Sequence, residues 1–174
     1  QVMILSGDHI YRMDYAEMLQ FHCDNLADAT VACMKVPIKE ASAFGVLAVD
    51  DDARVKQFQE KPRCPRCMPG EPNHALASMG IYIFSMEYLT KALIMDAEDQ
   101  NSHHDFGKNI IPSIIDNHRV FAFPFRDENR KRQAYWRDVG TIDAYYEANM
   151  DLIQIDPMLN MYDSHWPVRT FLPN

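Results

Sequence analysis

The sequence lacks both a long apolar run and an excess of basic residues. No segment approaches the roughly 18 consecutive apolar residues that a membrane span needs, so we expect no membrane partner. The 174 residues include 25 Asp and Glu against 17 Lys and Arg, a formal charge of −8. A nucleic-acid-binding protein needs a basic surface instead. We therefore expect no nucleic-acid partner. The first residues also lack the basic stretch and cleavage site of a targeting peptide.

Glycine and cysteine are both scarce, with six and four residues respectively. A chain of this length buries roughly two thirds of the surface that it exposes when unfolded, so it needs neither disulfides nor a structural metal. Cys64 and Cys67 form a C-x-x-C pair in a proline-rich segment. A closed zinc site needs four ligands, and Cys23 and Cys33 fall in a predicted helix and strand. A surface loop is therefore favoured over a zinc site.

Short apolar runs alternate with segments of helical periodicity, which predicts an α/β fold. Strands are predicted at residues 2–5, 30–36, 46–49, 55–58, 78–84 and 120–125. Helices are predicted at about residues 15–26, 88–95, 105–117 and 142–155, the last capped by Thr141. We expect the strand at 2–5 to be buried on both faces. The strands at 46–49 and 55–58 flank three aspartates and predict an antiparallel hairpin. Charged residues predict a loop at 126–132.

Five of the six glycines lie in short polar motifs at the predicted ends of these elements. The motifs are at residues 6–9, 44–46, 78–80, 105–108 and 138–141. Glycine lets the backbone turn sharply or approach a ligand closely. In open α/β sheets, ligands bind beyond the carboxyl ends of the strands. Each motif is equally compatible with an ordinary turn.

Asp8 and Asp138 are candidate metal ligands. Asp8 directly follows the first predicted strand, and Asp138 lies just before the last predicted helix. Proteins usually hold Mg²⁺ with one or two carboxylates, while substrate phosphates and water complete the coordination. If the fold brings these two side chains together, they form such a site. A structural role in a loop or cap is the alternative for each.

Glu60 and Lys61 place an acid and a base side by side at the end of a predicted strand. The carboxylate can accept hydrogen bonds from hydroxyl groups, and the ammonium can offer charge to a phosphate. Pro62 restricts the backbone at that point. A solvated ion pair is the alternative.

Several motifs occur together and in order. They are SGDHIY at 6–11, ACM at 32–34, EASAFGV at 40–46, FQEKP at 58–62, ASMGIY at 77–82, HDFGK at 104–108, YWRDVGT at 135–141 and MYD at 161–163. Their order and spacing resemble the sugar-nucleotide pyrophosphorylases, and among these the bacterial glucose-1-phosphate adenylyltransferases. The WRDVGT form and the FGV context resemble that group more than its UDP- or dTDP-glucose relatives.

The resemblance implies a Rossmann-like nucleotidyltransferase domain of three αβα layers, with a mixed, mostly parallel sheet. It implies that residues 1–155 are part of that catalytic domain, truncated at its N-terminus, and that residues 156–174 connect it to a C-terminal β-helix that the chain lacks. The implied parent protein is cytoplasmic, allosteric and a homotetramer. It would transfer the adenylyl group of ATP to glucose 1-phosphate, giving ADP-glucose and pyrophosphate in the first committed step of bacterial glycogen synthesis.

The resemblance also implies roles for individual residues. Asp8 and Asp138 would hold Mg²⁺ and, with Lys61, be the catalytic residues. Glu60 and Lys61 would bind the sugar and its phosphate. The backbone of Gly45 and the side chain of Ser78 would line the sugar pocket.

Two other functions are compatible with these motifs. One is a non-catalytic, regulatory sugar-phosphate-binding subunit of the same fold. The other is a related UDP- or dTDP-sugar pyrophosphorylase. The presence of both aspartates together with Lys61 favours a catalytic protein over a regulatory one.

The Gly-rich loop that cradles the nucleotide in this family precedes the segment that matches residues 2–5. We therefore expect the purified 174-residue chain, tested alone, not to make ADP-glucose at a useful rate. Incubation with ATP, glucose 1-phosphate and Mg²⁺, followed by chromatographic detection of ADP-glucose, measures this. Robust turnover would contradict the expectation.

Overall fold

The computed structural model of the chain describes residues 1–125 and 135–164. The chain divides into two compact units. One, which we call the sheet unit, comprises residues 1–5 and 15–124. The other, which we call the ribbon unit, comprises residues 6–14 and 125–174. The predicted domain boundary between residues 155 and 156 stays a prediction. The charged loop predicted at 126–132 lies outside the described residues.

The sheet unit alternates strands with helices, as the apolar runs predict. Its elements, in chain order, are β1 (Val2–Ile4), α1 (Tyr15–Asp24), β3 (Ala29–Pro37), the short helix η1 (Ala41–Ala43), β4 (Gly45–Val49), β5 (Val55–Glu60), β6 (His74–Phe84), α2 (Met86–Glu98), the π-helical turn η2 (Phe106–Ile110), α3 (Ile111–Ile114) and β7 (Val120–Pro124).

These strands form one mixed sheet in the order β5-β4-β6-β3-β7, and β1 also pairs with β6. Among the described strand pairs, β3 and β7 are parallel, whereas β6 is antiparallel to β1, β3 and β4. The α/β class and the mixed sheet are confirmed, but the predicted predominance of parallel pairs is wrong. Strand β4 lies between β5 and β6 and is antiparallel to both, so these two pairings add no parallel pair to the sheet.

The predicted hairpin is present as β4 and β5. The Asp50 carboxylate accepts hydrogen bonds from the backbone N–H groups of Asp52 (3.1 Å) and Arg54 (2.9 Å), which closes the turn between the strands. Strands joined by so short a turn must run antiparallel. In contrast, β1 is half-buried, not buried on both faces as expected. Among the described strands it pairs with β6 alone.

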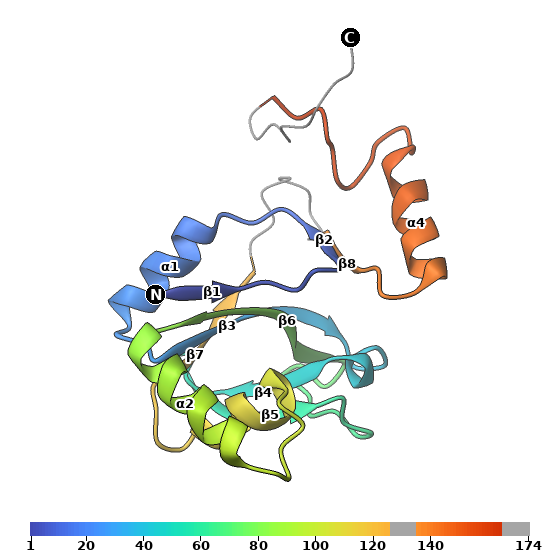
Figure 1. Cartoon of the computed structure of the whole chain (residues 1–174). Helices are drawn as coiled ribbons and strands as arrows, with labels where there is room; N and C mark the ends of the chain where they lie inside the picture. The colour runs from blue at the N-terminus through green and yellow to red at the C-terminus, as the bar shows by residue number, and fades with distance from the viewer. Residues whose placement is uncertain (126–134, 165–174) are drawn as a thin grey trace. The chain divides into compact units, whose positions relative to one another are not determined.

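Helix α1 covers one face of the sheet, and α2 lies on the other side (Figure 1). On the α1 face, Phe21 packs edge-on against Phe121 and Phe123 of β7, with ring centroids 6.3 and 5.4 Å away. His22 is buried there, and its Nδ1 lies 2.8 Å from the hydroxyl of Thr30. The buried imidazole of His22 therefore has a hydrogen-bond partner, Thr30, on the sheet beneath α1.

The opposite face of the sheet packs against α2 and α3. Phe84 of β6, Leu89 of α2 and Ile111 of α3 belong to one apolar core cluster there. Helices thus cover both faces of the sheet, which confirms the predicted three-layer αβα arrangement within the sheet unit.

The helix predicted at 105–117 is replaced by two shorter elements, η2 and α3. The backbone carbonyl of Asp105 accepts hydrogen bonds from the N–H groups of Asn109 (2.9 Å) and Ile110 (3.2 Å), so the chain widens into a π-turn. Pro112 then lies in the first turn of α3. Proline has no N–H to donate and is tolerated at that position, where the N–H would have no partner within the helix. The prediction of one regular helix was therefore wrong.

The ribbon unit contains two short strands that the apolar pattern did not predict, β2 (His9–Tyr11) and β8 (Trp136–Asp138). They pair antiparallel, with His9 opposite Asp138. Helix α4 (Ile142–Leu152) follows. The hydroxyl of Thr141 accepts a hydrogen bond from the N–H of Ala144 (3.2 Å), so the predicted N-cap is confirmed. The helix ends three residues before the predicted end.

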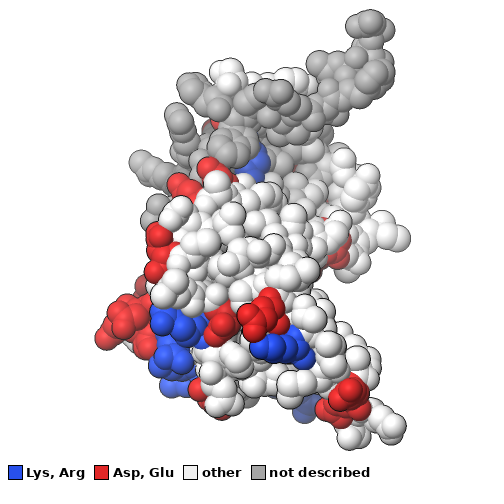
Figure 2. All heavy atoms as spheres, turned by 60° about the vertical axis from the view of Figure 1, so that its left-hand side comes forward, with Lys and Arg blue, Asp and Glu red and all other residues white. Residues whose placement is uncertain are grey.

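The described surface carries charges of both signs. On the face drawn in Figure 2, Lys and Arg side chains lie beside Asp and Glu side chains. Glu87 and Lys91 of α2, for example, form an ion pair of 2.6 Å. None of the helices in residues 1–125 and 135–164 has the length and apolar character that crossing a membrane requires.

The core cluster beneath α2 predicts the effect of truncating Phe84, which has no exposed surface. We expect Phe84→Ala to lower the free energy of unfolding by about 3–5 kcal/mol, because it removes a large buried side chain and leaves a cavity. Urea unfolding followed by circular dichroism measures the change. Met86→Ala is the control, because Met86 is 60% exposed and should change stability by less than about 0.5 kcal/mol. Equal losses in the two variants would contradict the burial described here.

Candidate functional site

The structure places the site residues expected from the sequence in two groups, one in each unit. Those in the sheet unit are Gly45, Glu60, Lys61 and Ser78. Those in the ribbon unit are Asp8 and Asp138.

Gly45, Glu60 and Ser78 lie in one row across three neighbouring strands. Gly45 of β4 is the register partner of Glu60, the last residue of β5. On the other side of β4, Val46 pairs with Ala77 of β6. The next position along that antiparallel pair places Gly45 beside Ser78. Residues from three separate motifs are therefore adjacent on the sheet.

A bulge in β6 shapes the position of Ser78. The pairing of β3 with β6 shifts between Val31, opposite Tyr82, and Cys33, opposite Ser78. Gly80 lies within this irregularity with a φ of +67°, and its N–H approaches the Ser78 hydroxyl at 3.3 Å. Bulges re-aim side chains locally and are frequent near binding sites. Only 8% of Ser78 is exposed.

Two glycines make room for the carboxylate of Glu60. A Cβ atom on Gly45 would lie 3.0 Å from Oε2 of Glu60 and would overlap the ring of Phe58. A Cβ atom on Gly107, in η2, would overlap the same Oε2 atom. The backbone therefore approaches Glu60 from two sides, at distances that no other residue type permits without movement.

Burial raises the pKa of Glu60 above its ordinary value, and the negative charge of Asp105 raises it further. The charges of Lys61 and Lys108 act in the opposite direction. Burial also raises the pKa of Tyr82, an effect that a hydrogen bond from Ser78 reduces and the charge of Glu60 increases. Sequence reasoning had not identified Asp105, Lys108 or Tyr82 as individual site residues, although two of the family motifs contain them.

Lys61 is exposed and has an unusual backbone conformation. Its φ is +44°, in the left-handed region that residues other than glycine seldom adopt. Its N–H donates to the carbonyl of Phe44 (3.1 Å), which ties the end of β5 to the segment before β4. Such a conformation costs about 1–3 kcal/mol and persists only where the surrounding structure imposes it. Strain of this kind is common at ligand sites.

In the ribbon unit, the pairing of β2 with β8 brings Asp8 and Asp138 together. A Cβ atom on Gly140 would lie 3.1 Å from Oδ1 of Asp138 and 3.2 Å from Oδ2 of Asp8, so both carboxylates reach the same point of the backbone. The Gly140 N–H donates to Oδ1 of Asp138 at 2.8 Å. Asp8, His9 and Asp138 each offer one donor atom, and these atoms lie within 4.8 Å of one another. The structure therefore brings the two aspartates together.

The environment of Asp8 favours its ionised form. A hydrogen bond of 2.6 Å from the Ser6 hydroxyl lowers the pKa of Asp8, and the nearby His9 also contributes, since its Nε2 lies 3.6 Å from Oδ1. The His9 ring packs edge-on against Trp136, with centroids 4.9 Å apart. Exposed, ionised carboxylate oxygens are the donors that Mg²⁺ prefers. The two carboxylates therefore fit Mg²⁺, whereas the imidazole nitrogen of His9 is a donor that transition metals prefer.

A cavity of about 600 Å³ lies elsewhere in the sheet unit, between α2 and the segment at 110–118. Tyr88, Lys91 and His118 are among its lining residues. It contains none of the site residues expected from the sequence.

Residues 1–155 match the family model described as Nucleotidyl transferase. The chain belongs to the nucleotidyl transferase family. The matched range includes every residue of both site groups.

Curated relatives in this family are similar along nearly the whole chain. A glucose-1-phosphate adenylyltransferase of Rhodopirellula baltica is 56% identical over 172 residues, which is 99% of this chain and 39% of the relative. Glucose-1-phosphate adenylyltransferase 2 of Alkalilimnicola ehrlichii is 58% identical, covering 97% and 40%. Glucose-1-phosphate adenylyltransferase 2 of Vibrio cholerae is 56% identical, covering 98% and 42%. The chain thus spans about two fifths of the length of these relatives, and the resemblance predicted from the motifs is confirmed.

The electrostatics of the sheet-unit group predict an effect of Asp105→Asn on Glu60. Removing the negative charge should lower the pKa of Glu60 toward its ordinary value. Asparagine can still cap η2 as Asp105 does, so the turn should be retained. Titration of the Glu60 carboxyl carbon by NMR measures the shift. Asp116→Asn, at an exposed acidic residue, is the control and should leave the pKa of Glu60 unchanged.

The substitution Asp105→Asn should also alter how the stability of the protein depends on pH. Because the folded-state pKa of Glu60 is raised, the folded protein binds this proton more tightly than the unfolded chain does. Its contribution to stability is therefore present at low pH and is lost as the pH rises through the raised pKa. Asp105→Asn should make this loss smaller. The free energy of unfolding is measured against pH around the raised pKa of Glu60. An unchanged or steeper pH dependence in Asp105→Asn would contradict the effect of Asp105 on Glu60.

Proposed function

We propose that this chain provides the sugar-phosphate-binding and metal-binding parts of a glucose-1-phosphate adenylyltransferase. One observation carries the proposal. Asp8 and Asp138, which are distant in the sequence, meet at Gly140 in a chain of the nucleotidyl transferase family. The names of its relatives, which are 56–58% identical, support ATP and glucose 1-phosphate as the substrates.

In the proposed reaction, a phosphate oxygen of glucose 1-phosphate attacks the α-phosphorus of ATP. A new P–O bond forms, the bond from the α-phosphorus to the oxygen that bridges to the β-phosphorus breaks, and pyrophosphate leaves with those electrons. ADP-glucose is the other product. Phosphoryl-type transfer of this kind is accelerated mainly by positioning and charge neutralisation, so it needs no nucleophilic side chain.

We assign Asp8 and Asp138 to the binding of Mg²⁺. Bound Mg²⁺ would supply the positive charge that neutralises the reacting phosphates. The chain's own contribution is to keep Asp8 ionised and to hold the two carboxylates close together. Ser6 does the first by its hydrogen bond to Asp8. The pairing of β2 with β8 does the second.

We assign the row at the end of β5 to the sugar and its phosphate. The Glu60 carboxylate would accept hydrogen bonds from sugar hydroxyl groups. Gly45 lets the sugar approach the backbone. The side chain of Ser78 would line the same pocket. Lys61 would contribute a positive charge to the phosphate of glucose 1-phosphate.

The wider setting follows from the same assignment. We propose a cytoplasmic enzyme of glycogen synthesis, acting as a homotetramer, without nucleic-acid or membrane partners. These statements rest on the relatives and on the charge balance, and they stay predictions.

Two substitutions in the complete gene product test the proposal. Asp8→Asn should lower kcat by about a hundredfold or more, because it removes one of two charges that hold the metal. Lys61→Ala should raise the KM for glucose 1-phosphate by about tenfold with a smaller effect on kcat, because it removes a contact with the bound substrate. Steady-state assays of ADP-glucose formation measure both.

Matched controls are available on the exposed surface. Asp116→Asn and Lys39→Ala make the same chemical changes at exposed positions outside the two site groups, and both should leave the kinetics unchanged. Normal kinetics in Asp8→Asn and Lys61→Ala would reject the catalytic assignment and point to the regulatory alternative.

A further inference from the structure

The turn at residues 102–109 presents three groups to Glu60. The Asp105 and Lys108 charges both act on its carboxyl group, and the backbone of Gly107 lies against its Oε2 atom. The Asp105 carboxylate also accepts a hydrogen bond from the Lys108 N–H (2.8 Å) and so begins η2. The position of this turn therefore determines the surroundings of Glu60.

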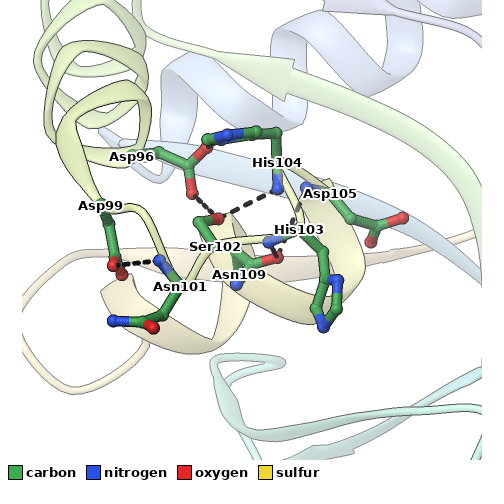
Figure 3. A network of polar contacts seen from close by, with 8 residues as sticks. All are labelled: Asp96, Asp99, Asn101, Ser102, His103, His104, Asp105 and Asn109. Carbon is green, nitrogen blue, oxygen red and sulfur yellow. Dashed lines mark hydrogen bonds and ion pairs between the residues drawn. The ribbon is translucent and has the colours of Figure 1, made fainter.

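Asp96, in the last turn of α2, anchors the turn from outside the site (Figure 3). Its Oδ1 accepts a hydrogen bond from the Ser102 hydroxyl at 2.5 Å, and its Oδ2 lies 2.8 Å from Nδ1 of His104. The Ser102 oxygen in turn accepts a hydrogen bond from the N–H of His104 at 3.0 Å. The Asp96 side chain is 12% exposed and also lines the cavity beside α2.

His104 is held in a conformation that it would not adopt unaided. Its φ is +55°, in the left-handed region. Its N–H and its ring are both tied, to Ser102 and Asp96 respectively. The Asn109 side chain closes the turn, since its Oδ1 accepts hydrogen bonds from the N–H groups of His103 (3.2 Å) and Asp105 (3.4 Å). Figure 3 shows these residues converging on one turn.

The other side of the turn is fixed in the apolar core. The Phe106 ring stacks on Tyr82 of β6 and tilts against Phe84, with centroids 5.7 Å apart in each case. Asp105 therefore lies between two anchors. One is the partly buried ring of Phe106, and the other is the backbone of His104, which hydrogen bonds to Ser102.

We propose that Asp96, Ser102 and His104 form a positioning unit for the sugar-phosphate site. The unit sets the position of Asp105, Gly107 and Lys108 relative to Glu60 and thereby the affinity for glucose 1-phosphate. It does not act on the metal carboxylates. This inference rests on the proposed function, because it assigns Glu60 to the sugar.

A matched pair of substitutions at His104 provides the sharpest test. Asparagine carries its amide nitrogen at the position of Nδ1 and tolerates the left-handed conformation, so His104→Asn should retain the bond to Asp96. Glutamine carries its nitrogen one bond further out. In the complete gene product, we expect His104→Gln to raise the KM for glucose 1-phosphate, and its Kd by calorimetry, about tenfold. His104→Asn should stay within about twofold of the wild type.

Asp96→Asn tests the other end of the unit. One of its oxygens becomes an NH₂ donor, which cannot accept from Ser102 or His104. It should reproduce the loss seen in His104→Gln, while kcat and the KM for ATP change by less than about twofold. Glu87→Gln is the matched control, since it removes an exposed carboxylate that pairs with Lys91 on the same helix. Its glucose 1-phosphate affinity and melting temperature should match those of the wild type.

Several results would overturn the positioning role. Equal affinity in His104→Gln and the wild type, or equal loss in His104→Gln and His104→Asn, would do so. A parallel decline in kcat, ATP affinity and melting temperature would indicate a merely structural role. Glu60→Gln, assayed alongside, separates the two proposals. If Glu60→Gln lowers affinity and Asp96→Asn does not, only the positioning role fails, whereas an unaffected Glu60→Gln rejects the proposed function as well.

Discussion

The sheet unit depends on the pairing of β6 along both of its edges. This strand of 11 residues is largely buried, so its backbone N–H and C=O groups need partners within the protein. Strand β3 pairs along one edge, and β4 and β1 share the other. The same strand supplies Ser78 and Tyr82 near Glu60 and Phe84 in the core. Strand β6 therefore contributes both to the apolar core and to the candidate site.

The pKa values of Glu60 and Asp8 are shifted in opposite directions, and the causes differ. Burial and a neighbouring charge raise the pKa of Glu60, whereas a hydroxyl donor lowers the pKa of Asp8. The difference suits the two assignments. A metal ligand should be ionised and open to water, while a residue that recognises hydroxyl groups gains from partial shielding, because hydrogen bonds strengthen in a lower dielectric.

Much of the fold could be predicted from the sequence because its signals are local. The β4–β5 hairpin follows from the aspartate turn, and the start of α4 follows from Thr141. Other features depend on contacts between distant segments. Strands β2 and β8 have only three residues each and no apolar alternation, so their pairing has no periodic signature. The π-turn at η2 and the bond from Asp96 to His104 likewise arise only when α2 and the following turn are in place. For the candidate site, the motifs predicted the residues. That Gly45, Glu60 and Ser78 lie close together on β4, β5 and β6 could be learned only from the strand register.

Glu60 is the last residue of β5, which lies at one end of the strand order. Because side chains alternate along a strand, a slip of one residue in the β4–β5 pairing would turn its carboxylate to the opposite face of the sheet. The approach of Gly45 and Gly107 to the Glu60 carboxylate therefore exists in a single register of the hairpin. A ligand that binds there stabilises that register over its neighbours by mass action. A bound sugar phosphate, if it occupies the position proposed for it, would in this way favour the native strand alignment at equilibrium.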